Sequence, residues 1–104
     1  MKVPAATLER LIDEATVDAY TEAEQVSGFL TAIQDNLALP FVTRVLGAEV
    51  SVERVELTGA DEIVDVCRRG RTRQAVPILA LPLPKPAPNG TKWIEAYRRW
   101  AHGR

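Results

Sequence analysis

The sequence has few of the residue types that build most enzyme and metal centres. Its 104 residues include one cysteine and one histidine, which cannot make an internal disulfide or a closed four-ligand zinc site. His102 lies close to the C-terminus, where helices fray, and Cys67 stands in an apolar pattern typical of a buried strand. Gly47, Gly59 and Gly70 are separate turn glycines, so no phosphate-cradling motif is present. We therefore expect a protein that is not an enzyme.

Long hydrophobic runs are also missing. No apolar stretch approaches the roughly 20 residues that a membrane span needs. Residues 1–14 contain acids where a signal peptide needs an apolar core, so we expect a cytoplasmic protein. A content of 46% hydrophobic and 26% charged residues is typical of a soluble globule. The length predicts a single domain over residues 1–104 with one modest core.

Charge is divided unevenly along the chain, although the formal net charge is only −1. Residues 1–65 contain thirteen Asp and Glu against four Lys and Arg, a net charge of −9. Residues 66–104 contain one acid against nine bases, a net charge of +8. This asymmetry indicates either a charged partner for one end or two halves that neutralise each other within the fold.

Hydrophobic spacing predicts three helices. Residues 5–15 repeat apolar positions at helical intervals, and a short extended connector is expected over 16–20. Thr21 and Glu24 form a capping box that predicts a second helix from about Glu22 to Leu37. A third helix is expected over 91–103. The apolar stripe of the second helix is Val26, Phe29, Leu30, Ile33 and Leu37, and that of the third is Trp93, Tyr97 and Trp100.

Residues 41–57 and 63–81 have strand character. The first segment predicts two strands, or one sharply bent strand, and its change of parity at Glu53–Arg54 predicts a β-bulge. The second predicts a hairpin around Gly70, in which Pro77 restricts its strand to an edge or to a position with a free N–H. Residues 81–90 contain four prolines and predict an extended arm. The expected fold class is α+β: two N-terminal helices, a small strongly bent antiparallel sheet or barrel, and a C-terminal helix.

Acidic residues gather at both ends of the second predicted helix. Asp18, Glu22 and Glu24 lie near its start, and Asp35 lies with Asn36 near its end. Oxygen-rich clusters suit calcium, which takes six to eight oxygen ligands. The alternative is that these acids only complement the helix macrodipole and that Glu24 serves the capping box. Glu24 and Asp35 are roughly 16 Å apart along a helix axis, so they cannot hold the same ion.

Four segments with matching order and spacing support the metal hypothesis. They are "DAYTEAEQVSGFLTAIQDNLALPF", "VLGAEVSVERVEL", "CRRGRTRQAVPILALPLP" and "WIEAYRRW". Over roughly residues 15–100 the chain resembles the small bacterial CcbP-type calcium-binding proteins. The resemblance implies a calcium buffer or sensor, and it assigns these family positions: Tyr20, Glu22, Glu24, Gln25, Asp35, Asn36, Pro40 and Phe41. With the acidic cluster it predicts a metal site at Asp18 and Glu22 first, then Glu24 and Asp35.

The chain departs from the family pattern in two respects. Gln34 stands where we expect an acid before Asp35 and Asn36, which removes one negative charge from that end of the helix. The family type is also more acidic overall, whereas this chain is nearly neutral and has a basic C-terminal third. Fewer carboxylates and a weaker local potential both lower cation affinity, so we expect this member either to bind calcium weakly or to have lost calcium binding.

An alternative function uses the basic end of the chain. Arginines around one hairpin and on the last helix could follow a phosphate backbone; they are Arg68, Arg69, Arg71, Arg73, Arg98 and Arg99. Trp93 and Trp100 have core spacing, however, and no aromatic platform is expected on the strands, so nucleic acid is the weaker hypothesis. The proline arm could instead dock onto a protein partner. We favour packing of this arm on its own sheet, with Leu79, Leu81 and Leu83 as anchors.

Overall fold

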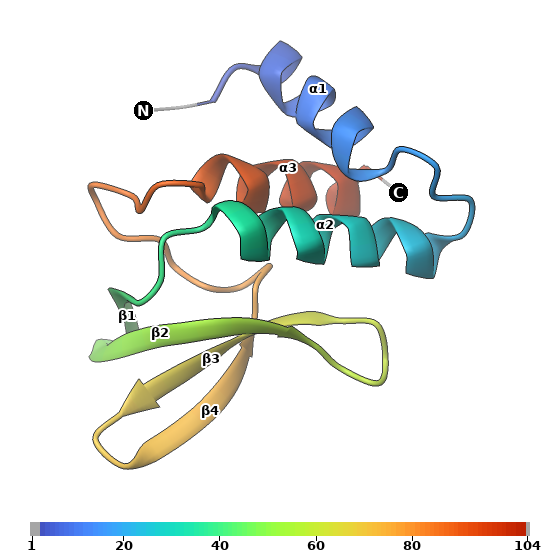
Figure 1. Cartoon of the computed structure of the whole chain (residues 1–104). Coiled ribbons are helices and arrows are strands. Elements are labelled where there is room, and N and C mark those ends of the chain that lie inside the picture. The colour runs from blue at the N-terminus through green and yellow to red at the C-terminus, as the bar shows by residue number, and fades with distance from the viewer. Residues whose placement is uncertain (1–2, 104) are drawn as a thin grey trace.

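The structure is a computed structural model that describes residues 3–103. Helices α2 and α3 lie over one face of a four-stranded antiparallel sheet with strand order β1-β2-β3-β4, and α1 lies on the side of these two helices away from the sheet (Figure 1). The elements are α1 (Ala5–Ala15), α2 (Glu22–Asn36), β1 (Phe41–Val45), β2 (Ala48–Leu57), β3 (Ile63–Arg69), β4 (Thr72–Pro77) and α3 (Thr91–His102). The predicted α+β class is confirmed. The sheet is not closed, because β1 and β4 are edge strands, so the barrel alternative is not confirmed.

Helix α2 begins as the sequence predicts. The Glu24 N–H donates to Thr21 Oγ1, and the Thr21 N–H donates to Glu24 Oε1, both at 3.1 Å. The helix buries Val26, Phe29 and Ile33, which share one face at i, i+3 and i+7. It ends at Asn36, one residue before the predicted end, because the backbone of the following residue is extended.

The segment between α1 and α2 differs from the predicted extended connector. Residues 16–18 form a turn, in which the Thr16 N–H and the Thr16 hydroxyl both donate to the Ile12 carbonyl, at 3.0 and 2.8 Å. The Ala19 N–H then donates to the Thr16 carbonyl. Asp18 has a φ of 57°, a left-handed conformation that Asp adopts more readily than most residues. The prediction was wrong here because β propensity was given more weight than side-chain capping.

The sheet follows the predicted bulge and hairpin. The register of β2 shifts between Val52 and Arg54. Because of this shift, Val52 and Val55 both lie on the inner face of the sheet, which also carries Asp65 and Cys67. Strands β3 and β4 pair antiparallel around Gly70. Strand β4 lies at the sheet edge, as Pro77 requires, because proline has no N–H for a central ladder.

The core confirms the predicted role of the third helix and of the proline arm. The Phe29 ring lies 5.3 Å from the Tyr97 ring and 5.2 Å from the Trp100 ring, centroid to centroid. The arm packs on its own sheet, since Leu81 is buried and the Thr43 hydroxyl donates to the Pro82 carbonyl at 2.6 Å. Its anchors are Ile78, Leu81 and the partly buried Leu83; the predicted anchor Leu79 is exposed.

Two glycines allow backbone segments to approach α2 closely. A Cβ built on Gly28 would lie 2.0 Å from the carbonyl oxygen of Ala15, the last residue of α1. A Cβ built on Gly90 would lie 2.1 Å from the carbonyl oxygen of Asn36, and Gly90 has a φ of 89°. The end of α2 is further held by the Ala38 N–H, which donates to the Asn89 carbonyl at 2.8 Å. The positions of α1 and of the segment before α3 therefore depend on these glycines.

Replacement of Gly28 by alanine tests this packing. Alanine normally stabilises a helix interior by about 1 kcal/mol relative to glycine, but its methyl group would here meet the Ala15 carbonyl. We expect Gly28→Ala to lower the free energy of unfolding by about 1–3 kcal/mol, measured by urea denaturation. The exposed neighbour Ser27→Ala is the control and should change stability little. A stabilised Gly28→Ala protein would show that α1 does not need this close approach.

Candidate functional site

The start of α2 and the end of α1 enclose a surface hollow of about 400 Å³. We call it the α1–α2 hollow; its lining residues are Ala15, Val17, Asp18, Ala19, Ala23, Glu24, Ser27 and Gly28. The turn at residues 16–18 brings Asp18 to this hollow, and the first turn of α2 brings Glu24. The sequence therefore predicted two acids that the fold places around the same hollow.

The capping box fixes the Glu24 carboxylate at the hollow. Its Oε1 atom accepts the N–H groups of Tyr20 and Thr21, at 3.3 and 3.1 Å. Glu22 is exposed in the same helical turn, although it shares a face with buried Val26, and it does not line the hollow. The structure thus groups Asp18 with Glu24, whereas the sequence analysis ranked Asp18 with Glu22.

Asp35 lies at the opposite end of α2, where its side chain is exposed. The Asn36 amide donates to the Ala32 carbonyl at 2.7 Å. Gln34, the residue that replaces an expected acid, donates its Nε2 to the Val55 carbonyl at 2.9 Å. A glutamate at neutral pH has no proton for this bond. Gln34 therefore joins α2 to β2 at the position where we expected an acid.

Within residues 3–103, no three His, Cys, Asp or Glu side chains lie close enough together to hold a metal ion. Asp61 and Glu62, in the loop between β2 and β3, do not complete such a group with the acids of α2. A cation at the α1–α2 hollow would therefore take most of its ligands from backbone carbonyls and water. This arrangement is available to calcium, which accepts both.

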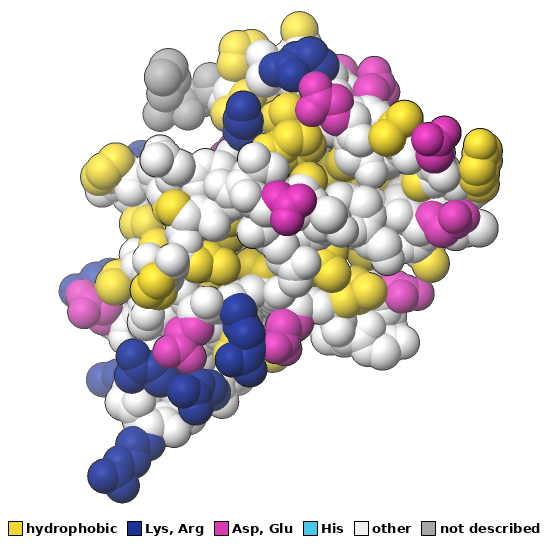
Figure 2. Space-filling view, viewed as in Figure 1, with side chains coloured by type: hydrophobic (Ala, Val, Ile, Leu, Met, Phe, Trp, Pro, Cys, Tyr) yellow, Lys and Arg dark blue, Asp and Glu magenta, His cyan; other side chains and the backbone are white. Residues whose placement is uncertain are grey.

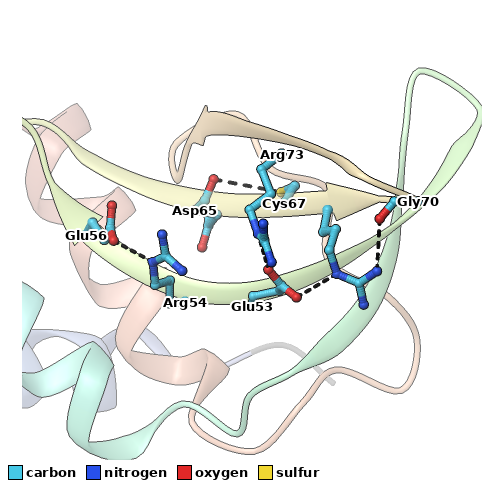
Figure 3. Close-up of polar contacts among 8 residues, drawn as sticks. Glu53, Arg54, Glu56, Asp65, Cys67, Gly70 and Arg73 are labelled. Carbon is cyan, nitrogen blue, oxygen red and sulfur yellow. Dashed lines mark hydrogen bonds and ion pairs between the residues drawn. The ribbon is translucent and has the colours of Figure 1, made fainter.

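The basic half of the chain is partly neutralised by the acidic half. Glu53, beside the bulge in β2, accepts from Arg68 Nε at 2.7 Å and from Arg73 Nε at 3.0 Å (Figure 3). These hydrogen bonds lower the pKa of Glu53 below its ordinary value. Arg99 also pairs with Glu9, at 3.3 Å. The expectation that the halves neutralise each other is confirmed for these three arginines.

Asp65 is an acid that the sequence analysis missed. It lies in the middle of β3 with a relative exposure of 0%, and neither carboxylate oxygen has a hydrogen-bond partner among the described residues. Burial raises the pKa of Asp65 to about 7, against the opposing effect of the nearby Arg98 charge. The signal in the sequence was a single acid inside the apolar run "IVDVC", which predicts burial of a carboxyl group.

The buried Asp65 predicts a pH dependence of stability. Between about pH 4 and pH 7 the unfolded chain has lost the Asp65 proton while the folded chain keeps it. The free energy of unfolding should therefore fall as pH rises, by about 1.4 kcal/mol per pH unit from this residue. Urea denaturation of Asp65→Asn across this range should lack that decline, since asparagine does not titrate. Equal slopes for the two proteins would contradict a buried, protonated Asp65.

Comparison with known proteins gives one family. The model of a CcbP-type family, described as calcium binding, matches residues 9–101. The match includes α2, all four strands and most of α3, together with each acid of the predicted site. No curated protein and no solved structure matches the chain. Within residues 3–103, no helix is long and apolar enough to cross a membrane.

Proposed function

Because the chain belongs to the CcbP-type calcium-binding family, we propose that it binds calcium first at the α1–α2 hollow, through Asp18 and Glu24. The observation that carries this proposal is the lining of the hollow, which contains both carboxylates. Glu22 lies in the same helical turn and adds negative potential nearby. Asp35 belongs to a second, weaker position at the other end of α2, too far away to contribute to the first.

The end of α1 favours a cation at this hollow. Ala15 is the last residue of α1 and lines the hollow, so the partial negative charge of a helix C-terminus lies beside the two carboxylates. The positive end of the α2 dipole opposes this effect, and Glu22 and Glu24 offset that opposition. Two carboxylates leave most of the six to eight calcium ligands to carbonyls and water. We therefore expect modest affinity, because ligand charge is low.

The packing of α2 supports a buffer rather than a sensor. Phe29 and Ile33 are fully buried, and Gly28 and Gly90 hold neighbouring backbone against the helix. Calcium at the α1–α2 hollow would thus hold the turn at residues 16–18 without separating a helix pair, the movement that sensors of the EF-hand type use. The proposed role is that of a non-enzymatic cytoplasmic calcium buffer, with the single cysteine as the support for a reducing compartment.

Isosteric amides at the two acids test the site by titration calorimetry. Asparagine tolerates the left-handed backbone of Asp18, and glutamine keeps the capping role of Glu24, so both variants remove charge and preserve the local fold. We expect Asp18→Asn and Glu24→Gln each to raise the calcium Kd by about tenfold, a loss of about 1.4 kcal/mol. Magnesium should bind more weakly, because it demands octahedral geometry and loses water reluctantly.

Two further variants serve as references in the same titration. Glu49→Gln removes an exposed acid from β2 and should leave calcium binding unchanged. Asp35→Asn should leave the tighter binding step unchanged, since this acid lies at the far end of α2. A wild-type protein that takes up no calcium at millimolar concentration, or a tighter step lost only in Asp35→Asn, would contradict the proposed site.

Replacement of Gln34 by glutamate tests the second proposed calcium position, at the end of α2 beside Asp35. Gln34→Glu removes the hydrogen bond to Val55, so the free energy of unfolding should fall by about 1 kcal/mol, while an added charge beside Asp35 should strengthen the weaker calcium step. Gln34→Ala is the matched variant, because it removes the bond without adding charge. Thermal unfolding and calorimetry together measure both effects. If the two variants bind calcium equally, the end of α2 holds no ion.

A further inference from the structure

A second concave site lies on the sheet, away from the acids at α2. It is a groove of about 400 Å³ between the tips of the β1–β2 and β3–β4 hairpins. Its walls include Val45, Ala48 and Val50 on one side and Thr72, Gln74 and Val76 on the other, with Leu46 and Arg69 among the remaining residues. We call it the hairpin groove. The volume is within the range of ligand sites, about 300–1,000 Å³, and the lining contains no aromatic residue on which a nucleobase could stack.

Strand β4 borders the hairpin groove as an open edge. The Ile78 N–H donates to the Ile63 carbonyl. This bond determines which opposing residues of β3 and β4 are hydrogen-bonded pairs and which are not, because the two kinds alternate along an antiparallel ladder. By that alternation Arg73 and Ala75 direct their N–H and C=O groups away from β3. Five of the six β4 residues are exposed, and these outward groups bond to no other described backbone. The edge can therefore accept another strand.

The rim of the hairpin groove is positively charged. Glu53 engages Arg68 and Arg73, but the side chains of Arg69 and Arg71 form no ion pair or hydrogen bond among the described residues. Lys and Arg side chains gather over the sheet end farthest from the helices, where the β3–β4 hairpin projects (Figures 1 and 2). An occupant that follows β4 would meet these two cations, so charge complementarity selects an acidic one.

Leu46 adds an apolar contact at a conformational cost. It is fully exposed and has a φ of 50°, and Gly47 after it has a φ of 78°. Asn or Gly suits the first position of such a turn, and a leucine with positive φ is strained. Backbone strain of this kind concentrates at functional sites. Leu46 lines the groove and offers its side chain to an occupant.

We propose that the hairpin groove binds an acidic, extended peptide segment of a partner protein, which adds a strand along β4. Its backbone pairs with Arg73 and Ala75, the apolar side chains on one face of the added strand enter the groove beside Leu46, and the carboxylates at the end that reaches the hairpin tip face Arg69 and Arg71. Strand addition of this kind takes affinity from backbone hydrogen bonds and specificity from side-chain pockets. A second copy fits less well, because paired β4 edges would bring like-charged arginines together.

The probe is a fluorescein-labelled peptide of about ten residues, long enough to span β4. It alternates valine with serine and ends in a C-terminal run of glutamates, which an antiparallel strand places at the hairpin tip. We expect saturable binding by fluorescence anisotropy, with amide NMR shifts at Arg73 and Ala75. The same peptide with lysine in place of glutamate should not bind, and an oligothymidylate of equal charge should bind much more weakly. Absent peptide binding, or an oligothymidylate that binds as tightly, would overturn the proposal.

Three variants separate the groove from bulk charge and from misfolding. Leu46→Asn should raise the melting temperature, because Asn–Gly suits the turn, yet raise the peptide Kd by about tenfold. Arg71→Glu should raise the Kd at least as much, whereas Lys92→Glu, the same charge change on α3, should leave it unchanged. Equal losses in Arg71→Glu and Lys92→Glu, or unchanged binding by Leu46→Asn, would overturn the proposal. A wild-type protein that forms a dimer by itself, and that becomes a monomer in Leu46→Asn, would also overturn the proposal.

Discussion

The close approach of backbone to α2 at Gly28 and Gly90 is the constraint on which the rest of the structure depends. It brings the end of α1 against the middle of α2, and the segment before α3 against its end. Phe29 and Ile33 then lie fully buried among the helices and the sheet. Because no Cβ fits at either contact, the helical layer has little freedom to rearrange. The same contact that positions α1 also forms the α1–α2 hollow, so packing and the proposed calcium site share one cause.

Local signals in the sequence predicted most of the fold. The capping box at Thr21 and Glu24, the bulge near Glu53 and the edge position required by Pro77 each follow from short-range chemistry. The turn at residues 16–18 did not, because it depends on how the Thr16 side chain bonds to Ile12. The choice between open sheet and barrel also depends on long-range contacts, which no local pattern contains.

The candidate site was only partly predictable for the same reason. Helical periodicity separated Glu24 from Asp35 correctly, but it could not show that Glu24, rather than Glu22, shares a hollow with Asp18. The role of Gln34 could not be seen either, since its partner Val55 lies on a distant strand.

The fold explains part of the charge asymmetry along the chain. Glu53 and Glu9 neutralise part of the basic half, and Arg69 and Arg71 remain beside the hairpin groove.

A crystal structure of the protein grown with calcium would test the central claim most directly. If Asp18 and Glu24 hold the ion, electron density for calcium will lie in the α1–α2 hollow, with carboxylate oxygens at about 2.3–2.6 Å from it. Carbonyl oxygens near the end of α1 and water molecules should complete the coordination. Calcium bound only elsewhere, with the Asp18 and Glu24 carboxylates directed apart, would contradict the proposed site.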